Sequence, residues 1–264
     1  MKLLLVVNEL PLWLAALIMV AAAEIFSIGL VLGCRAAFGL SRLSLNNEVA
    51  GFKFAVVGLF YGVLLAFVVI AVWEDYRNTE TAVRNEAKAV ADLYRMSYAL
   101  PEQDASAIRE HLLSYADQVR RAEWSTMARG QASKAVADEL GRLSEAIFNV
   151  QPQDMNDQAI YQQALKLLTI ITDNRNERLD SADGTAPSVL WLVLLIGGLI
   201  TLAYPAFFGA SNLIAQILMT AALAALVALS LLLAAVFDFP FSGDVKVSAS
   251  PFDAAIQDMV PLPQ

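Results

Sequence analysis

The sequence predicts an all-α fold: a polytopic membrane protein with four transmembrane helices and a helical-bundle extramembrane domain between the second and third. Hydrophobic residues make up 58% of the 264-residue chain and the mean hydropathy is +0.55, whereas ordinary soluble domains are roughly 45–50% apolar. The apolar residues gather in four stretches of about 20 residues or more, the length that crosses a hydrocarbon core of about 30 Å. No segment alternates between polar and apolar residues as a half-buried strand does.

The four stretches form two hairpins, because the segments that join them in pairs are short. The predicted spans are Leu12 to Gly33, Phe54 to Trp73, Val189 to Phe208 and Leu213 to Phe237. A loop from Cys34 to Lys53 joins the first pair and a turn over residues 209–212 joins the second. We therefore expect a first transmembrane hairpin at 1–73, a soluble helical bundle at 74–186, a second hairpin at 187–237 and a C-terminal tail at 238–264.

The middle segment, residues 74–186, is predicted to be helical throughout. Residues 73–100 contain neither Gly nor Pro, so the second span is predicted to continue as one long helix up to Pro101. Apolar residues recur every three or four positions from 102 to 124, which predicts an amphipathic helix. Ser125 is the expected cap of a third helix that ends before Pro152, and Asp154 of a fourth.

Charge and composition exclude several classes of function. The segment from Glu74 to Asp183 holds 13 of the 18 basic and 19 of the 26 acidic residues, so a nucleic-acid partner is not expected. His111 is the only histidine, and the sequence contains no metal-ligand cluster, nucleophile motif or phosphate loop. We therefore predict no catalytic residue, no metal, no cofactor and no enzymatic activity. The lone Cys34 cannot form an internal disulfide.

The second span carries two sets of residues that are candidates for function. A set of small residues allows helices to approach closely in lipid. A neighbouring set of bulky residues would face lipid, other spans or, if several copies assemble, a central axis, where a hydrophobic ring can gate ions by dewetting. The small set is Gly51, Ala55, Gly58, Gly62 and Ala66, and the bulky set is Leu59, Phe60, Val63, Phe67 and Ile70.

Charged residues in and beside the spans are further candidates. Glu24 is the one formally charged side chain near the middle of a span, so it is expected to be protonated and hydrogen-bonded, to face a water-filled path, or to lie nearer the interface. Glu74 and Asp75 follow the second span directly and would stand at a pore mouth. With Glu80 and Glu86 they either form acidic rings in an oligomer or are solvated charges. The expected partners of such solvated charges are Arg77, Arg84 and Lys88.

Short motifs in this chain resemble the bestrophin family. The run from Gly62 to Tyr76, an apolar span that ends in Trp73-Glu74-Asp75, resembles the bestrophin pore helix. A post-span motif, Asp238-Phe-Pro240-Phe241-Ser-Gly243-Asp244, looks like the segment that follows the fourth span of bestrophins. With Asn47 to Gly51 and Glu123-Trp124, the whole chain looks like a bacterial bestrophin-like family of membrane proteins.

The resemblance implies a pentameric ion channel whose second helix lines the pore and whose bundle and termini lie in the cytoplasm. The Trp-x-x-Tyr register places the pore neck at Ala55, Leu59 and Val63, where no aromatic residue stands. Phe60 or Phe67 could serve instead if the helix is rotated. The acidic run that binds calcium in bestrophins is reduced here to Asp244, so calcium activation is not carried over.

The leading hypothesis is therefore an oligomeric ion channel. A membrane sensor or scaffold that uses its four-helix bundle to bind a ligand or partner is the alternative. The expected partners are the lipid bilayer, further copies of the chain and inorganic ions, and the expected location is the bacterial inner membrane. Positive charges lie on both sides of the spans, so charge leaves the orientation open, whereas the resemblance favours a cytoplasmic bundle. Acidic residues at the mouth favour cations, and the resemblance favours anions.

Overall fold

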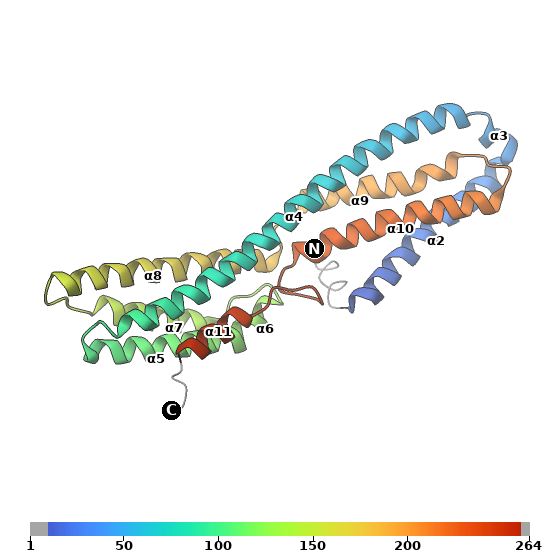
Figure 1. Ribbon diagram of the computed structural model, residues 1–264. Helices are drawn as coiled ribbons and strands as arrows, with labels where there is room; N and C mark the ends of the chain where they lie inside the picture. Colours follow the sequence, from blue (N-terminus) through green and yellow to red (C-terminus); the bar gives the residue numbers. More distant parts are fainter. Residues whose placement is uncertain (1–9, 260–264) are drawn as a thin grey trace. The chain divides into compact units, whose positions relative to one another are not determined.

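A computed structural model describes residues 10–259 of the chain and contains no strand within them (Figure 1). Four of its helical segments are long and apolar enough to cross a membrane. The chain divides into two compact units. The first comprises the residues up to Glu74, Ala186–Asp238 and Gly243–Val245. The second comprises Asp75–Thr185, Phe239–Ser242 and the residues from Lys246 onward.

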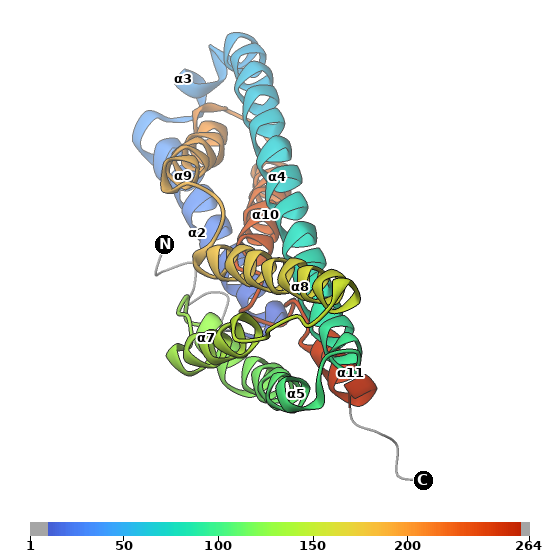
Figure 2. The same ribbon diagram turned by 90° about the vertical axis from the view of Figure 1, so that its left-hand side faces the viewer.

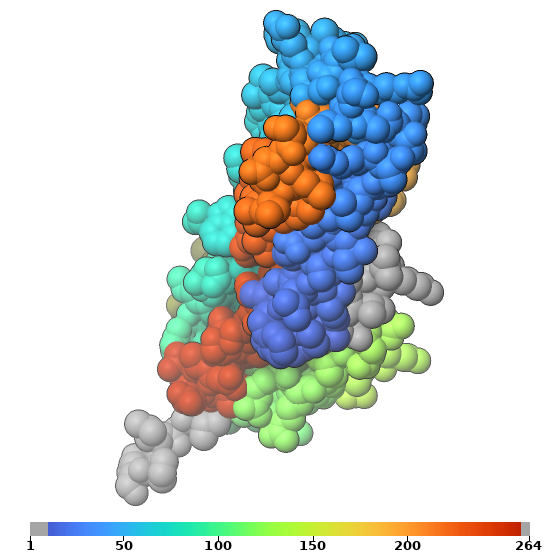
Figure 3. Space-filling model, turned by 90° about the vertical axis from the view of Figure 1, so that its right-hand side faces the viewer, coloured from blue at the N-terminus to red at the C-terminus, as the bar shows by residue number. Residues whose placement is uncertain are grey.

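The first unit holds the apolar helices. They are α2 (Leu12–Phe38), α3 (Leu40–Ser44), the first half of α4 (Asn47–Ser97), α9 (Ser188–Ala203), the short η3 (Tyr204–Phe207) and α10 (Leu213–Asp238). Helix α2, in blue, lies against the orange second hairpin (Figure 3). Each predicted span thus coincides with an apolar helix, but the expected loop after the first span is largely helical. Helix α2 continues past Gly33 to Phe38 and ends at Gly39, whose φ of +74° departs from helix geometry.

A close contact between α4 and α9 fixes the packing of this unit. The ring of Tyr61 lies directly over Gly197 and Gly198. A Cβ atom at Gly197 would stand 2.8 Å from Tyr61 Cδ2, and one at Gly198 would stand 2.9 Å from the Tyr61 hydroxyl. Real Cβ atoms do not approach so closely, so a side chain at either position would require Tyr61 or one of the two helices to shift.

The second unit is a helical bundle with a core of its own. It contains the second half of α4, α5 (Glu102–Gln118), a π-helical turn η1 (Val119–Glu123), α6 (Trp124–Met127), α7 (Lys134–Phe148), α8 (Met155–Asp180), η2 (Ser181–Asp183) and α11 (Ser250–Met259). Figure 2 shows α5, α7 and α8 alongside this half of α4. Fully buried apolar side chains come from each of the long helices, for example Leu93, Ile108, Leu143 and Ile171.

The long helix and the cap of α8 were predicted correctly, whereas the predicted cap of the third helix was wrong. Helix α4 is continuous to Ser97, just before Pro101, and the Asp154 side chain accepts from the Asp157 amide at 2.8 Å. Ser125 does not cap the third helix: it lies inside α6, and α7 begins after Ser133. The π-helical turn carries the chain on past residue 118 without a break, so the helical path ends later than a simple cap at Ser125 implies.

Candidate functional site

The membrane half of α4 has one buried and one exposed face. Tyr61, Leu65, Val68 and Val72 are buried against the other apolar helices. The bulky residues predicted for a pore lie on the exposed face, where Leu59 is 66% exposed and Val63 is 47% exposed. Phe60, Phe67 and Ile70 are exposed there too. The described residues therefore leave a continuous apolar strip of α4 without cover.

The small residues lie at the margin of this exposed strip. Ala55, Gly62 and Ala66 are exposed, whereas Gly51 and Gly58 are half-buried. A Cβ atom at Gly58 or Gly62 would meet nothing within 4 Å in the described chain. Gly58, Gly62 and Ala66 line a groove of about 370 Å³ whose other wall is α10. No helix of the described chain fills the groove. Close helix packing at these small residues therefore stays a prediction, and it would need a helix from another chain.

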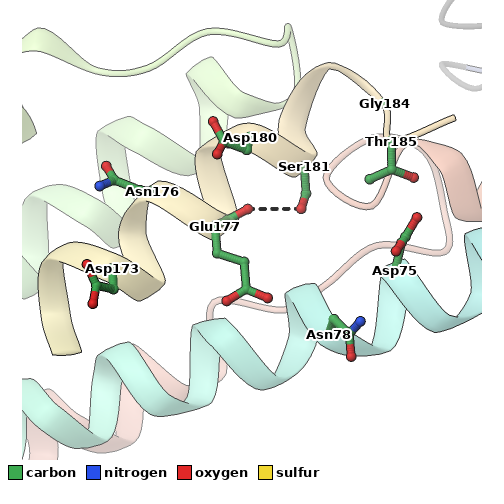
Figure 4. A pocket seen from close by; sticks show the side chains of 9 residues that line it. All are labelled: Asp75, Asn78, Asp173, Asn176, Glu177, Asp180, Ser181, Gly184 and Thr185. Atoms are coloured by element: carbon green, nitrogen blue, oxygen red, sulfur yellow. Dashed lines mark hydrogen bonds between the residues drawn. The ribbon is translucent and has the colours of Figure 1, made fainter. Parts of the chain in front are cut away.

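Acidic residues gather where α4 leaves the apolar unit. Glu74 is exposed and Asp75 is half-buried. Asp75 lines a pocket of about 590 Å³ with Asp173, Glu177 and Asp180 of α8. Figure 4 shows these carboxylates on two facing helices, with the Ser181 hydroxyl bonded to the Glu177 carbonyl at 2.9 Å. No group of His, Cys, Asp or Glu among the described residues is arranged to hold a metal ion. The carboxylates make this pocket a region of negative potential.

The other two acidic residues of α4 have different surroundings. Glu80 pairs with Arg84 at 3.0 Å on the exposed surface, as expected of a solvated helix charge. Glu86 is fully buried, so it contributes neither to an acidic ring nor to a solvated surface pair. Both interpretations of Glu86 were wrong. Its place on α4 explains this, because Val83, Glu86, Val90 and Leu93 share one buried face at helical spacing.

Glu86 belongs to a buried ionic cluster that sequence reasoning missed. Arg178 is fully buried and donates to Glu86 through Nε at 2.7 Å and to Glu123 through Nη2 at 2.8 Å. Arg175 pairs with Glu123 at 2.6 Å, and the Tyr115 hydroxyl donates to Glu86 at 2.6 Å. Two carboxylates and two guanidinium groups thus balance within the core. Burial lowers the pKa of Arg178, but Glu86, Tyr115 and Glu123 outweigh it and the pKa is raised.

The cluster depends on the π-helical turn. Glu123 is the last residue of η1, and the wider turn places its carboxylate among Arg175, Arg178 and the Ser133 amide. Burial, together with the negative charge of Glu86, raises the pKa of Tyr115 well above its ordinary value. The only sequence signal for this arrangement was the Glu-Trp pair at 123 and 124. In the structure, Cζ of Arg178 lies 5.2 Å from the centroid of the Trp124 ring.

Glu24 lies in α2 and is half-buried. Within the described residues it has no hydrogen bond and no ion pair. Its neighbour Ser27, which is fully buried, donates to the Leu202 carbonyl at 2.6 Å. The structure therefore leaves a carboxyl group in an apolar span, and its role stays a prediction.

The post-span motif has a structural role within each unit. In the first unit, Asp238 accepts from the Ala186 amide at 2.7 Å and from Trp191 Nε1 at 2.8 Å, which ties the end of α10 to the beginning of α9. Asp244 accepts from the Leu12 amide at 2.7 Å, at the first residue of α2, and Gly243 has a φ of +76°. In the second unit, Phe241 packs edge-on against Trp124, and the Pro240 carbonyl accepts from the Val247 amide.

Known proteins share the fold of this chain. Residues 20–252 match the family described as Bestrophin-like, Bestrophin-like domain. A bacterial bestrophin homologue from Klebsiella pneumoniae carrying a single substitution is similar in structure, with a TM-score of 0.70 at 12% identity over 92% of this chain and 97% of that one. The same homologue phased by zinc anomalous scattering gives a TM-score of 0.69 at 12% identity over 92% and 96%.

No curated protein sequence matches the chain. At 12% identity the solved structures establish a shared fold. The family match extends over most of the chain, from the middle of α2 to the first turn of α11. This chain therefore belongs to the Bestrophin-like family.

Proposed function

We propose that this protein is one subunit of a pentameric ion channel and that α4 lines its pore. The observation that carries the proposal is the exposed apolar strip of α4 in a chain of the bestrophin-like fold. The bestrophin family as a whole is one of ion channels, and the solved relatives are titled bacterial bestrophin homologues.

The strip has the chemistry of a hydrophobic gate. Copies of α4 around a symmetry axis would place Leu59 and Val63 in successive rings, with Phe60, Phe67 or Ile70 beside them. An apolar ring expels water when it is narrow, and an ion cannot shed its hydration shell there without a large free-energy cost. Opening then requires only that the ring widen enough to be wetted.

The small residues supply the packing that such an assembly needs. Gly58, Gly62 and Ala66 line an unfilled groove between α4 and α10. Association in lipid depends on close van der Waals contact rather than on burial of apolar surface. We expect a helix of the neighbouring subunit to occupy this groove. In that arrangement Leu59 and Val63 would face the symmetry axis.

We place the protein in the bacterial inner membrane, with the bundle of residues 74–186 in the cytoplasm. The apolar spans lie in the first unit, whereas the second unit holds most of the charged residues of the chain, as suits a domain in water. Glu74 and the acidic pocket around Asp75 would raise the local concentration of cations at the inner mouth. We therefore propose cations as the favoured ions.

The test is ion flux from liposomes that contain the purified protein, under a potassium gradient and then under a chloride gradient. Replacing Leu59 and Val63 with Ala should increase flux several-fold, because a wider and less apolar ring is wetted more readily. The matched control is Leu218→Ala, a similarly exposed leucine of α10 that lies outside the groove, which should leave flux unchanged. A verified oligomer that conducts no ion at any pH or voltage would remove the channel proposal and favour a sensor or scaffold.

A further inference from the structure

A second site lies in the first unit, away from the apolar strip. A pocket of about 330 Å³ opens between the beginning of α4, η3 and the first turns of α10. Most of its lining is apolar, and Phe54, Phe208, Met219 and Leu223 are its largest apolar side chains. Its volume lies near the lower end of the range for ligand sites, roughly 300–1,000 Å³. One acyl chain fits such a volume better than two.

One polar group in this pocket has no partner. Gln216 is 5% exposed, and its Nε2 donates to the Phe208 carbonyl at 2.8 Å. This bond fixes the orientation of the amide, because the reverse orientation would set two oxygens against each other. Its Oε1 is buried and makes no hydrogen bond with any described residue. A buried acceptor is costly unless a donor reaches it. Gln216 lines the pocket, so a ligand there that carries an O–H or N–H group would supply the missing donor.

A cationic side chain is bonded to one residue of the pocket lining. Arg35, near the end of α2, donates through Nη1 to the carbonyl of Ala210, and Ala210 lines the pocket. Within the described residues no carboxylate pairs with Arg35, so the rest of its guanidinium fork is available to an anion. Arginine binds phosphate well in this geometry. Residues 209–212 form the turn between the two helices of the second hairpin, where lipid headgroups lie.

We propose that this pocket binds a single-chain glycerophospholipid with a free glycerol hydroxyl. The acyl chain lies along Phe54, Met219 and Leu223, the hydroxyl donates to Gln216 Oε1, and the phosphate pairs with Arg35. These three groups follow one another in such a lipid in the same order, from tail to head. The inference does not depend on ion conduction.

The test is binding of a palmitoyl lysophospholipid that carries a photoreactive group in its chain, compared with the same lipid methylated on the glycerol hydroxyl. The protein is the delipidated, purified oligomer, and crosslinks are mapped by mass spectrometry. Wild type should bind the hydroxyl lipid about tenfold more tightly than the methylated one, which corresponds to one hydrogen bond. Crosslinks should fall on peptides that contain Phe54, Met219 or Leu223.

Two variants and one control make the test specific. Gln216→Leu should abolish the preference for the free hydroxyl, and Arg35→Gln should weaken both lipids equally. Ser188→Ala, an exposed residue of α9 outside this pocket and outside the groove between α4 and α10, should behave as wild type. Equal binding of the two lipids to wild type, tighter binding of a diacyl phospholipid, or protection of the pocket by a neighbouring subunit would each overturn the proposal. The wild-type comparison holds even if a variant fails to fold, and none of these outcomes depends on flux.

Discussion

At the scale of single residues, the least expected feature is that an acidic residue of α4 belongs to the core of the second unit. Glu86, Glu123, Arg175 and Arg178 are all buried and each contacts an opposite charge. Burial of an ion pair carries a large desolvation cost, so loss of one partner costs more than the pair itself contributes. The cluster thereby specifies how α4, α8 and the π-helical turn meet.

Replacing Glu86 with Gln should destabilise the protein by about 3–5 kcal/mol, because Arg178 keeps its charge and loses a buried carboxylate. The measurement is thermal or denaturant unfolding of the purified protein, followed by tryptophan fluorescence, to which Trp124 contributes. The control is Glu80→Gln, which removes an exposed pair worth less than about 1 kcal/mol. Equal effects of the two substitutions would show that the buried cluster adds no stability.

A second residue gives a prediction about pH. Burial tends to raise the pKa of Glu139, but hydrogen bonds from His111 at 2.9 Å and from Arg142 at 2.7 Å outweigh it, so its pKa is lowered. A lowered pKa means that the folded state binds this proton less readily than the unfolded state does. The stabilisation is therefore complete above the ordinary Glu value of 4.5 and is lost as pH falls through the folded pKa.

The melting temperature of wild type should accordingly fall more steeply below about pH 4.5 than that of Glu139→Gln. Scanning calorimetry from pH 7 to pH 3.5 measures the difference. Asp138→Asn, a neighbouring exposed carboxylate, is the control for general charge effects. Parallel curves for wild type and Glu139→Gln would contradict the assignment.

At the scale of elements, helix length and apolar composition were predictable and the details of their joints were not. The span at α10 and the continuation of α4 follow from runs of apolar or helix-forming residues. The π-helical turn could not be predicted, because its stabilisation comes from contacts of Glu123 with Arg175 and Arg178, which are far away in sequence. Helix α11 was missed because its apolar residues, such as Phe252 and Met259, are too few to stand out in a short tail.

In the candidate site, too, some features could be predicted from the sequence and others could not. The exposure of Leu59 and Val63 agrees with their spacing on α4, since they lie one turn apart. Glu86 and Gln216 could not be placed, because the partners that decide their roles come from other elements. Local periodicity tells which face of a helix a residue occupies, whereas the identity of what covers that face is a property of the fold.

The contact between α4 and α9 leads to a prediction at this scale. Gly197→Ala should lower the melting temperature by several degrees, because its Cβ would stand 2.8 Å from Cδ2 of the Tyr61 ring, so that the ring or the helices must shift. Gly29→Ala, in α2, is the matched control, since a Cβ there meets nothing within 4 Å in the described chain. Melting in detergent compares the two. A Gly197→Ala protein as stable as Gly29→Ala would show that the ring and the helices can shift at no cost.

At the scale of the whole molecule, four helical segments are long and apolar enough to cross a membrane, and if all four cross, residues 75–185 lie on one side. The segment between α2 and α4 then lies on the other side. Cys34 stands near the end of α2 and is the only thiol in the chain. Labelling of this thiol can therefore report the orientation of the protein in the membrane.

If the bundle is cytoplasmic, a membrane-impermeant maleimide added to intact spheroplasts should label Cys34. Labelling is measured by the mass shift of the purified protein. A Cys34→Ser, Asn85→Cys protein is the matched control, because position 85 is an exposed site of the second unit and should react only after permeabilisation. The reverse pattern would place the bundle outside and would remove the cytoplasmic assignment.

The glycine pair beneath Tyr61 also limits how this family can diverge. A side chain at position 197 or 198 requires Tyr61 to shift, and a smaller residue 61 removes that requirement. In an alignment of relatives these positions should covary: those that keep an aromatic residue at the position of Tyr61 should keep glycine opposite it, and those that lose it should accept alanine or serine. Two substitutions that are each harmful alone would then be neutral together, so the order in which they occur is restricted in evolution.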